Sequence, residues 1–223
     1  MKKFELTNEF VTNMFGTKLF RIRALVEFGD VEAGELGGYV EKESNLGHDD
    51  NAWVYGNAQV SGNARVYGNA RVYGNAWVYG DAQVSGDARV YGNAWVYGDA
   101  QVSGDAQVYG NAWVYGDAQV SGDAQVSGDA RVSGNARVCG NGDYAYAHGF
   151  GSVNRTTTFF RLKDGGVGVR CGCFYGTLAQ FRDKIRETHG ETKKAQEYLM
   201  LADLMELRFE EDENEVGNRK YVE

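Results

Sequence analysis

Fifteen consecutive copies of a six-residue motif occupy Asn51–Gly140, and they constrain the fold more than any other feature of this chain. The motif is Asn/Asp-Ala-x-Val-Tyr/Ser-Gly, with a cysteine in the Tyr/Ser place of the last copy. A second period of eighteen residues lies over the first, because Trp77–Ala94 and Trp95–Ala112 differ only by Arg89 against Gln107. Fixed self-similarity of this kind marks a solenoid. Six residues per side and eighteen per turn predict a triangular parallel β-helix of about five coils.

The motif also indicates which side chains face the core. Side chains of a strand alternate between two faces, so the Ala and Val of each copy, which are two residues apart, point the same way. Both are apolar and invariant, and we therefore expect the fifteen pairs from Ala52/Val54 to Ala136/Val138 to point inward. The residue between them and the Tyr/Ser then point outward. Gly followed by Asn or Asp predicts a tight bend at each corner, because these residues tolerate positive φ.

Charge is distributed unevenly along the chain. The net charge is −8, but residues 51–140 hold seven Asp against five Arg and so contribute only −2. This pattern offers no basic surface for nucleic acid. The first ten residues lack the apolar run of a signal peptide, and no stretch is long enough to span a membrane. With three cysteines, an odd number, we expect reduced thiols and a cytoplasmic location.

Three regions follow from these patterns. Residues 1–50 are expected to form a small N-terminal β cap and the segment that leads into the first coil, with strand-like runs at Lys3–Leu6 and Lys18–Val26. Residues 51–148 are the predicted solenoid, and 149–223 the C-terminal cap or oligomerisation region. Caps are needed because the open ends of a solenoid expose unpaired strands and core.

The C-terminal region combines a predicted hairpin with two predicted helices. Thr156–Leu162 and Val167–Phe174 resemble two strands around a turn. Thr177 is a typical helix N-cap and Gly190 a typical C-cap, and the second helix is expected at about 193–209. The apolar faces comprise Leu178, Phe181 and Ile185 in the first helix and Ala195, Tyr198, Leu199, Ala202, Met205 and Phe209 in the second. These faces would close the last coil or, alternatively, join copies of the chain.

The chain resembles known families in three places. Its hexads resemble those of the bacterial hexapeptide-repeat superfamily, which implies left-handed coils, whereas the general crossover rule favours the other hand. Residues 22–58, IRALVEFGDVEAGELGGYVEKESNLGHDDNAWVYGNA, resemble the start of YdcK-like proteins, which carry a similar FxDVxAGxxGGWV stretch and are often labelled acetyltransferases. Residues 157–190 look like the C-terminal piece of uncharacterised phage and prophage repeat proteins. Together they imply the fold and a phage or prophage origin, but no demonstrated activity.

At period eighteen the outward positions sort into three walls. One wall, here called the aromatic wall, consists of Trp77, Trp95, Trp113, Tyr79, Tyr97 and Tyr115. A second wall carries mainly Gln and Ser, and the third carries Tyr55, Tyr73, Tyr91 and Tyr109. One interpretation of the aromatic wall is structural, because stacked side chains stabilise neighbouring strands. The other is that it binds a host protein, a second copy or, less favourably, a sugar. Six adjacent aromatics exceed the apolar area that monomers usually leave bare, and Trp and Tyr anchor interfaces.

An acyltransferase that uses coenzyme A is the alternative function. The hexapeptide-repeat resemblance implies a catalytic His near a coil, loops that interrupt the coils, and trimers that bind coenzyme A between subunits. Residues 51–140 contain no His and no interruption, and His48 and His148 lie just outside them. A lone His at a cap is more often structural than a general base. We therefore assign no catalytic residue and no cofactor.

Two further chemistries receive weak support. Cys171 and Cys173 would place both thiols on one side of a strand, with Cys139 and His189 as distant partners. Structural zinc sites generally show CxxC spacing and four ligands, so packing thiols are the simpler interpretation and no metal site is predicted. A DNA mimic needs dense negative charge along the rod, and seven Asp offset by five Arg do not provide it. The sequence thus favours a non-enzymatic binding or scaffold protein that engages a protein partner or itself through the aromatic wall.

Overall fold

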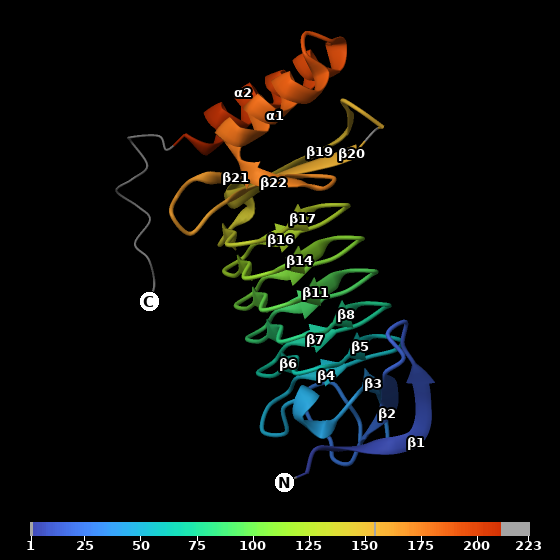
Figure 1. The fold of residues 1–223 in the computed structure, drawn as a ribbon. Helices are drawn as coiled ribbons and strands as arrows, with labels where there is room; N and C mark the ends of the chain where they lie inside the picture. Colours follow the sequence, from blue (N-terminus) through green and yellow to red (C-terminus); the bar gives the residue numbers. More distant parts are fainter. Residues whose placement is uncertain (1, 154, 211–223) are drawn as a thin grey trace, which may run out of the picture.

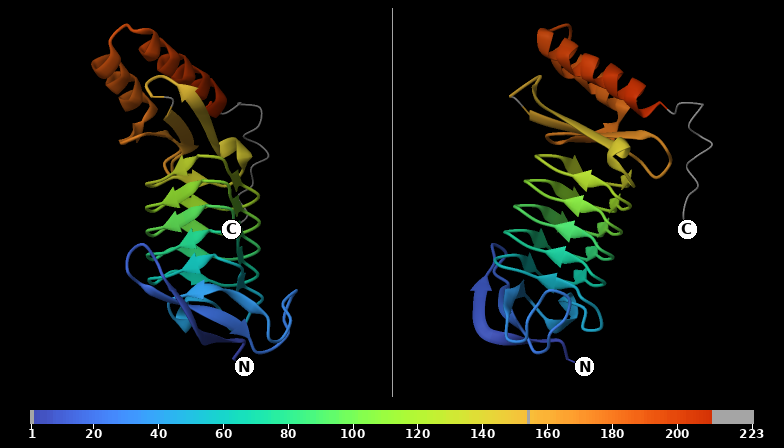
Figure 2. Two further views of the ribbon diagram at one scale, coloured as in Figure 1. Left: turned by 90° about the vertical axis from the view of Figure 1, so that its right-hand side faces the viewer. Right: turned by 180° about the vertical axis from the view of Figure 1, so that it is seen from behind.

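The computed structural model describes residues 2–153 and 155–210, which form an elongated column with a cap at each end (Figure 1). Two further views show the coils stacked along one axis, with the N-terminal cap at one end and the C-terminal helices at the other (Figure 2). The strands of the coils form three sheets, one for each wall of the column. The column is a parallel β-solenoid, which confirms the fold class that the repeats predict. Within the described residues, no helix is long and apolar enough to cross a membrane.

Each hexad contributes one short strand to one wall of the column. The strands are β4 (Trp53–Val54), β5 (Gln59–Val60), β6 (Arg65–Val66), β7 (Arg71–Val72), β8 (Trp77–Val78), β9 (Gln83–Val84), β10 (Arg89–Val90), β11 (Trp95–Tyr97), β12 (Gln101–Val102), β13 (Gln107–Val108), β14 (Trp113–Tyr115), β15 (Gln119–Val120), β16 (Gln125–Val126), β17 (Arg131–Val132) and β18 (Arg137–Val138). They pair in parallel one turn apart, in the orders β5-β8-β11-β14-β17, β4-β7-β10-β13-β16 and β6-β9-β12-β15-β18. Equivalent residues of successive coils therefore lie directly opposite each other, as Trp95 does between Trp77 and Trp113.

The core of the column is built as the motif predicts. The alanine and valine of all fifteen copies are fully buried, which confirms them as the inward pair. Every corner glycine from Gly56 to Gly134 has positive φ. At Gly98 a Cβ would also lie 3.0 Å from the backbone nitrogen of Gly116 in the next coil, so both the conformation and the coil spacing require glycine there.

The column begins before the first copy of the motif. The N-terminal cap contains β1 (Phe4–Thr12), β2 (Lys18–Ala24) and β3 (Leu36–Val40), in which β1–β2 and β2–β3 are antiparallel. Strand β3 then pairs in parallel with β5, and after the short 3-10 helix η1 (Glu43–Asn45) Leu46 bridges to Val66. Val40 and Leu46 are buried in the same core as the motif valines. A turn without the motif thus precedes the repeats, in residues that the sequence placed in the N-terminal cap.

The N-terminal cap also covers an outward position of the first coil. Trp53 is fully buried, with Phe4 and Phe28 packed edge-on against it at ring-centroid distances of 6.2 and 5.3 Å. The ammonium group of Lys3 donates to the main-chain carbonyl of Asp50 at 2.8 Å, which ties the N-terminal strand to the same coil. An outward aromatic at the end of the column is therefore part of the core rather than of a surface.

The C-terminal cap is an antiparallel sheet that carries two helices. Its elements are the 3-10 helix η2 (Asn141–Asp143), β19 (Tyr144–Phe150), β20 (Arg155–Arg161), β21 (Val167–Cys171), β22 (Phe174–Thr177), α1 (Leu178–His189) and α2 (Lys193–Phe209). As predicted, the side chain of Thr177 caps α1 by accepting from the amide of Gln180, and Gly190 is its C-cap. The coil strands end with β18, and β19 belongs to the cap sheet, so the column stops short of residue 148.

This sheet separates the helices from the column. Phe160 and Leu162 of the β20 segment join the core of the solenoid, whereas Phe159 packs among the helix residues. The hydroxyl of Thr158 accepts the backbone N–H of Arg131 at 2.9 Å and so pairs with the last coil. The expectation that the helices close the last coil is therefore wrong. The alternating side chains of β20 cover the coil with one face of the sheet and leave the other face for α1 and α2.

Candidate functional site

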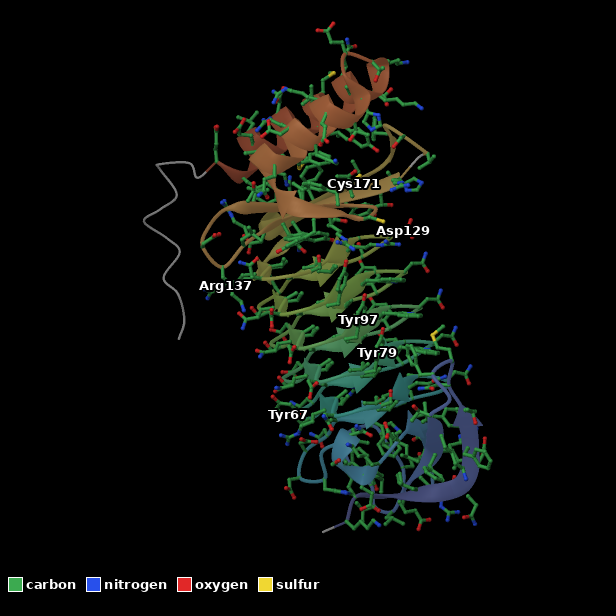
Figure 3. All side chains as sticks on the ribbon, viewed as in Figure 1. Tyr67, Tyr79, Tyr97, Asp129, Arg137 and Cys171 are labelled. Atoms are coloured by element: carbon green, nitrogen blue, oxygen red, sulfur yellow. The ribbon has the colours of Figure 1, made fainter. Side chains whose placement is uncertain are left out.

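The aromatic wall consists of two parallel stacks of rings. The centroids of Trp77 and Trp95 are 5.2 Å apart, and those of Trp95 and Trp113 are 5.0 Å apart, with interplanar angles of 5° and 8°. The rings of Tyr79, Tyr97 and Tyr115 stack beside them at 4.9 Å. Figure 3 shows Tyr79 and Tyr97 one above the other on this face. The structure thus brings all six predicted residues together, because in-register strands repeat each position once per coil.

Stacking changes what this wall presents to a partner. Each of the six side chains is partly buried. Both faces of the Trp95 and Tyr97 rings are covered by the rings above and below, and each of the other four rings stacks on one neighbour. The two stacks also meet edge to face, as between Tyr79 and Trp95 at 6.1 Å and 78°. The wall therefore offers ring edges to the outside. A sugar that binds by stacking needs an open ring face, so this geometry favours a protein contact over a sugar.

Both ends of the aromatic wall are covered by residues from outside the two stacks. Phe15, from the N-terminal cap, lies 6.2 Å from Trp77 and 5.4 Å from Tyr79. At the far end the guanidinium of Arg131 lies 4.6 Å from the Trp113 ring, and that of Arg170 lies 5.7 Å from the Tyr115 ring. Cations over aromatic faces are attracted to the ring electrons. Arg131 follows Trp113 at the period of eighteen, whereas the sequence pattern did not reveal the contacts of Phe15 and Arg170, because these join segments far apart in the chain.

The turn between β1 and β2 extends the aromatic wall towards the N-terminal cap. We call Asn13–Thr17 the hairpin tip. The carboxamide oxygen of Asn13 accepts the backbone N–H groups of Phe15 and Thr17 at 3.0 and 2.9 Å, which holds the turn together. Met14 and Phe15 nevertheless remain 65% and 58% exposed. Two large apolar side chains in a tight turn before a glycine were the sequence signal for this surface, which the sequence reasoning missed.

Burial raises the pKa of two tyrosines of the aromatic wall, Tyr79 and Tyr97. It raises the pKa of Tyr97 to about 12, and the hydroxyls of Tyr115 and Tyr79 act in the same direction. Burial likewise raises the pKa of Tyr79 above its usual range. Tyr79 and Tyr97 are therefore uncharged at neutral pH, and the cations Arg131 and Arg170 lie at one end of the aromatic wall.

A second apolar surface lies on α2. Met200, Leu204 and Leu207 are 71%, 54% and 68% exposed. Of the predicted face, Leu199 is half-buried, and the others are buried against the cap: Ala195, Tyr198, Ala202, Met205 and Phe209. The spacing of four and then three residues places the exposed side chains on one stripe of the helix. This stripe is the feature of the C-terminal helices that bears on self-association.

The two histidines that flank the repeats are both engaged within caps. The Nδ1 atom of His48 accepts the backbone N–H of Lys3 at 3.2 Å, and its ring stacks on Phe4 at 4.3 Å. The Nδ1 atom of His148 lies 2.9 Å from the hydroxyl of Thr156. The first belongs to the N-terminal segment and the second to β19, so they stand at opposite ends of the column.

The cysteines are arranged differently from the prediction. Cys171 ends β21, but Cys173 lies in the turn before β22, so the expectation that both alternate on one strand is wrong. Both line a cavity of about 290 Å³ together with His189. Cys139 lies instead on the last coil, 3.5 Å from the hydroxyl of Ser121. Across residues 2–153 and 155–210, no three His, Cys, Asp or Glu side chains gather in a group that could hold a metal ion.

Comparison with known protein families identifies the repeats of the column. A family model described as YdcK Beta solenoid repeat matches residues 58–70, 64–80, 82–98, 100–116, 106–122 and 124–140. These segments lie within the column, so the coils are similar to the YdcK solenoid and support the YdcK-like resemblance. No curated protein matches the chain. The resemblances to the hexapeptide-repeat superfamily and to phage proteins stay predictions.

Proposed function

We propose that this protein is a rigid scaffold that binds a protein partner through the aromatic wall and the hairpin tip. The observation that carries the proposal is the exposure of Met14 and Phe15, at 65% and 58%, beside the six stacked rings. The tip and the stacks are joined through Phe15, which contacts both Trp77 and Tyr79. Contiguous apolar surface of this kind is typical of interaction sites.

The side chains of the aromatic wall need little further ordering when a partner binds. The rings stack in register on strands whose backbones pair from coil to coil, so their positions are fixed before a partner arrives. A preorganised surface loses less conformational entropy when it binds. Exposed ring edges beside Met and Phe side chains suit an apolar protein surface, in which such residues act as anchors.

The same proposal extends to origin and location. We place the protein in the cytoplasm of a bacterial host and propose that it is encoded by a phage or prophage, on the strength of the resemblance of residues 157–190 and of the thiol content. A host factor is then the favoured partner. The alternative, an acyltransferase, has no comparable observation in its favour, since the Nδ1 atoms of both flanking histidines already have partners within the caps.

Photo-crosslinking in cells tests the proposed surface. Phe15, at the hairpin tip, is replaced by the photo-reactive analogue benzoylphenylalanine, and Phe150, which is 44% exposed at the other end of the molecule, serves as the matched control. We expect a discrete crosslinked adduct from position 15 and none from position 150. Mass spectrometry of the adduct identifies the partner, and an adduct of twice the chain mass identifies a second copy.

Competition with unlabelled protein then distinguishes specific binding from non-specific adsorption. Excess unlabelled wild-type protein should abolish the adduct, and excess Met14→Ser/Phe15→Ser protein should not. The tip variant is preferred to Trp77/Trp95/Trp113→Ser because it leaves the stacks intact. Equal adducts from both positions, or equal competition by both proteins, would refute the proposal.

A further inference from the structure

The solenoid repeats one polar contact between successive coils. The hydroxyl of Tyr67 donates to the carboxamide oxygen of Gln83 at 3.1 Å, and that of Tyr91 donates to Gln107 at the same distance. In both pairs the partner stands sixteen residues later, in the coil above. The coils stack in register, and this brings both tyrosine hydroxyls to the side chain sixteen residues ahead.

In the first coil of the third wall, this contact becomes a carboxylate-binding site. The residue sixteen after Tyr55 is Arg71, and the two converge on Asp30 from the N-terminal cap. Asp30 accepts the Tyr55 hydroxyl at 3.1 Å and the Arg71 guanidinium at 2.8 Å. The loop that carries Asp30 is pinned by the bridge between Phe28 and Val31. A Tyr–Arg pair of adjacent coils is thus shown to receive a carboxylate in this chain.

One coil further on, the same pair recurs without a carboxylate. Tyr73 and Arg89 stand sixteen residues apart on the same wall, one turn above Tyr55 and Arg71. In the part of the chain that the structure describes, neither side chain has an ion pair or hydrogen bond, and Arg89 is exposed. The adjacent acid, Asp87, accepts from the amide of Asn69 at 3.0 Å instead.

The repeated pair opens into a groove. A hollow of about 370 Å³ is lined by Asp30, Tyr55, Arg71, Tyr73 and Arg89, so the occupied site and its unoccupied copy lie side by side. Above them the pattern ends, because the chain has Gln107 where a third arginine would stand, and Tyr91 is bonded to it. The groove therefore holds one free Tyr–Arg pair next to one that is filled.

We propose that Tyr73 and Arg89 bind the carboxylate of an acidic peptide, in the geometry in which Tyr55 and Arg71 hold Asp30. Arginine presents a planar fork of N–H donors that matches a carboxylate, and a hydroxyl adds a third donor. A peptide is favoured because the carboxylate that fills the equivalent site is itself carried by a main-chain loop. This site lies on the third wall and is independent of the aromatic wall.

Nuclear magnetic resonance of the arginine side chains tests the site. The probe is the acetylated tripeptide amide Gly-Asp-Val, which copies residues 29–31 and has the aspartate as its single charge, and Gly-Asn-Val is the control. We expect the Nε–Hε signal of Arg89 to shift saturably with a dissociation constant of about 1–10 mM, the range for one charge-assisted contact at the surface. The signals of Arg71, already paired, and of Arg65, on another wall, should stay in place.

Two variants make the assignment strict. Arg89→Gln copies the arrangement that the chain already has at Gln107, so it should fold normally. Because this variant has no Arg89 signal, its binding is compared with that of the wild type through the backbone amide signals around Tyr73, and it should lose at least nine-tenths of the binding. Asp30→Asn weakens the hydrogen bond from Arg71 to residue 30, and the Nε–Hε signal of Arg71 should then respond to the Asp peptide as well. Equal shifts with the Asn peptide, a shift of Arg65 as large as that of Arg89, or unchanged binding in Arg89→Gln would each overturn the proposal. Acetate with the affinity of the Asp peptide would overturn the peptide assignment.

Discussion

Two corners of the column stack aspartates on each other, with Asp81, Asp99 and Asp117 at one and Asp87, Asp105 and Asp123 at the other. Where asparagines occupy a corner they form a ladder, in which the side-chain amide donates to the residue one coil above, as Asn63 does to Asp81 at 3.1 Å. Asp81, Asp99 and Asp117 follow one another at this corner. A carboxylate has no N–H to donate, so the ladder of hydrogen bonds stops where the aspartates begin. We therefore predict that Asp99→Asn stabilises the protein.

The size of the effect follows from the coil spacing. Two unit charges about 5 Å apart in water repel by about 0.8 kcal/mol, and Asp99 has a like charge on each side. Salt near physiological strength removes roughly half of this repulsion. A new amide-to-carboxylate bond to Asp117 adds about 1 kcal/mol. The sum is about 2 kcal/mol, which corresponds to a rise in melting temperature of about 4–8 °C for a chain of this size.

Thermal unfolding followed by circular dichroism measures this shift. High salt should reduce the gain of Asp99→Asn but not abolish it, because the hydrogen bond remains. The control is Asn93→Asp, which removes the bond from Asn93 to Asn111 at 3.2 Å without stacking two carboxylates, and it should lower the melting temperature. If Asp99→Asn leaves the melting temperature unchanged or lowers it while the control behaves as stated, the ladder argument is refuted.

Three further predictions follow from the coils and from α2. Because the pKa of Tyr97 is raised to about 12, it contributes stability that is present below the ordinary tyrosine pKa and is lost as pH rises from about 10 towards 12. The free energy of unfolding in urea should therefore fall less between pH 8 and pH 11 for Tyr97→Phe than for the wild type. Gly98→Ala should cost about 1–3 kcal/mol, since φ is 72° and the Cβ would crowd the next coil; Gly16→Ala, at φ 80° with open space around it, should cost less in the same assay. If the protein self-associates through α2, light scattering should show Leu204→Lys/Leu207→Lys as a monomer with an unchanged melting temperature, and an unchanged mass would exclude this stripe.

The repeats made the column predictable, because every determinant of a coil lies within six residues. The inward Ala and Val, the corner glycines and the stacking of Trp77, Trp95 and Trp113 all follow from local spacing and register. The boundaries of α2 were predictable for the same reason, since an amphipathic period of one helix is a local signal. Contacts between the caps and the column were not. The burial of Trp53 beneath Phe4 depends on how distant segments meet.

The candidate sites show the same division. The period of eighteen predicts which residues form the aromatic wall. It does not predict that their rings stack face to face, because this depends on the side-chain rotamers. The carboxylate site on the third wall could not be predicted from the repeats, because it depends on Asp30, which lies forty-one residues before its partner Arg71. Nothing in the local spacing of Tyr55 or Tyr73 distinguishes the filled pair from the free one.

The coil Trp95–Ala112 touches neither cap: among the described residues, no hydrogen bond, ion pair or ring contact joins it to either end. Removing it would join Ala94 to Trp113 in the same register, and a further copy could be added as simply. Each such change would move the hairpin tip and α2 relative to each other by about 4.7–4.9 Å along the column without altering either. The distance between the two apolar surfaces at the ends of the molecule is therefore set by the number of eighteen-residue coils between them.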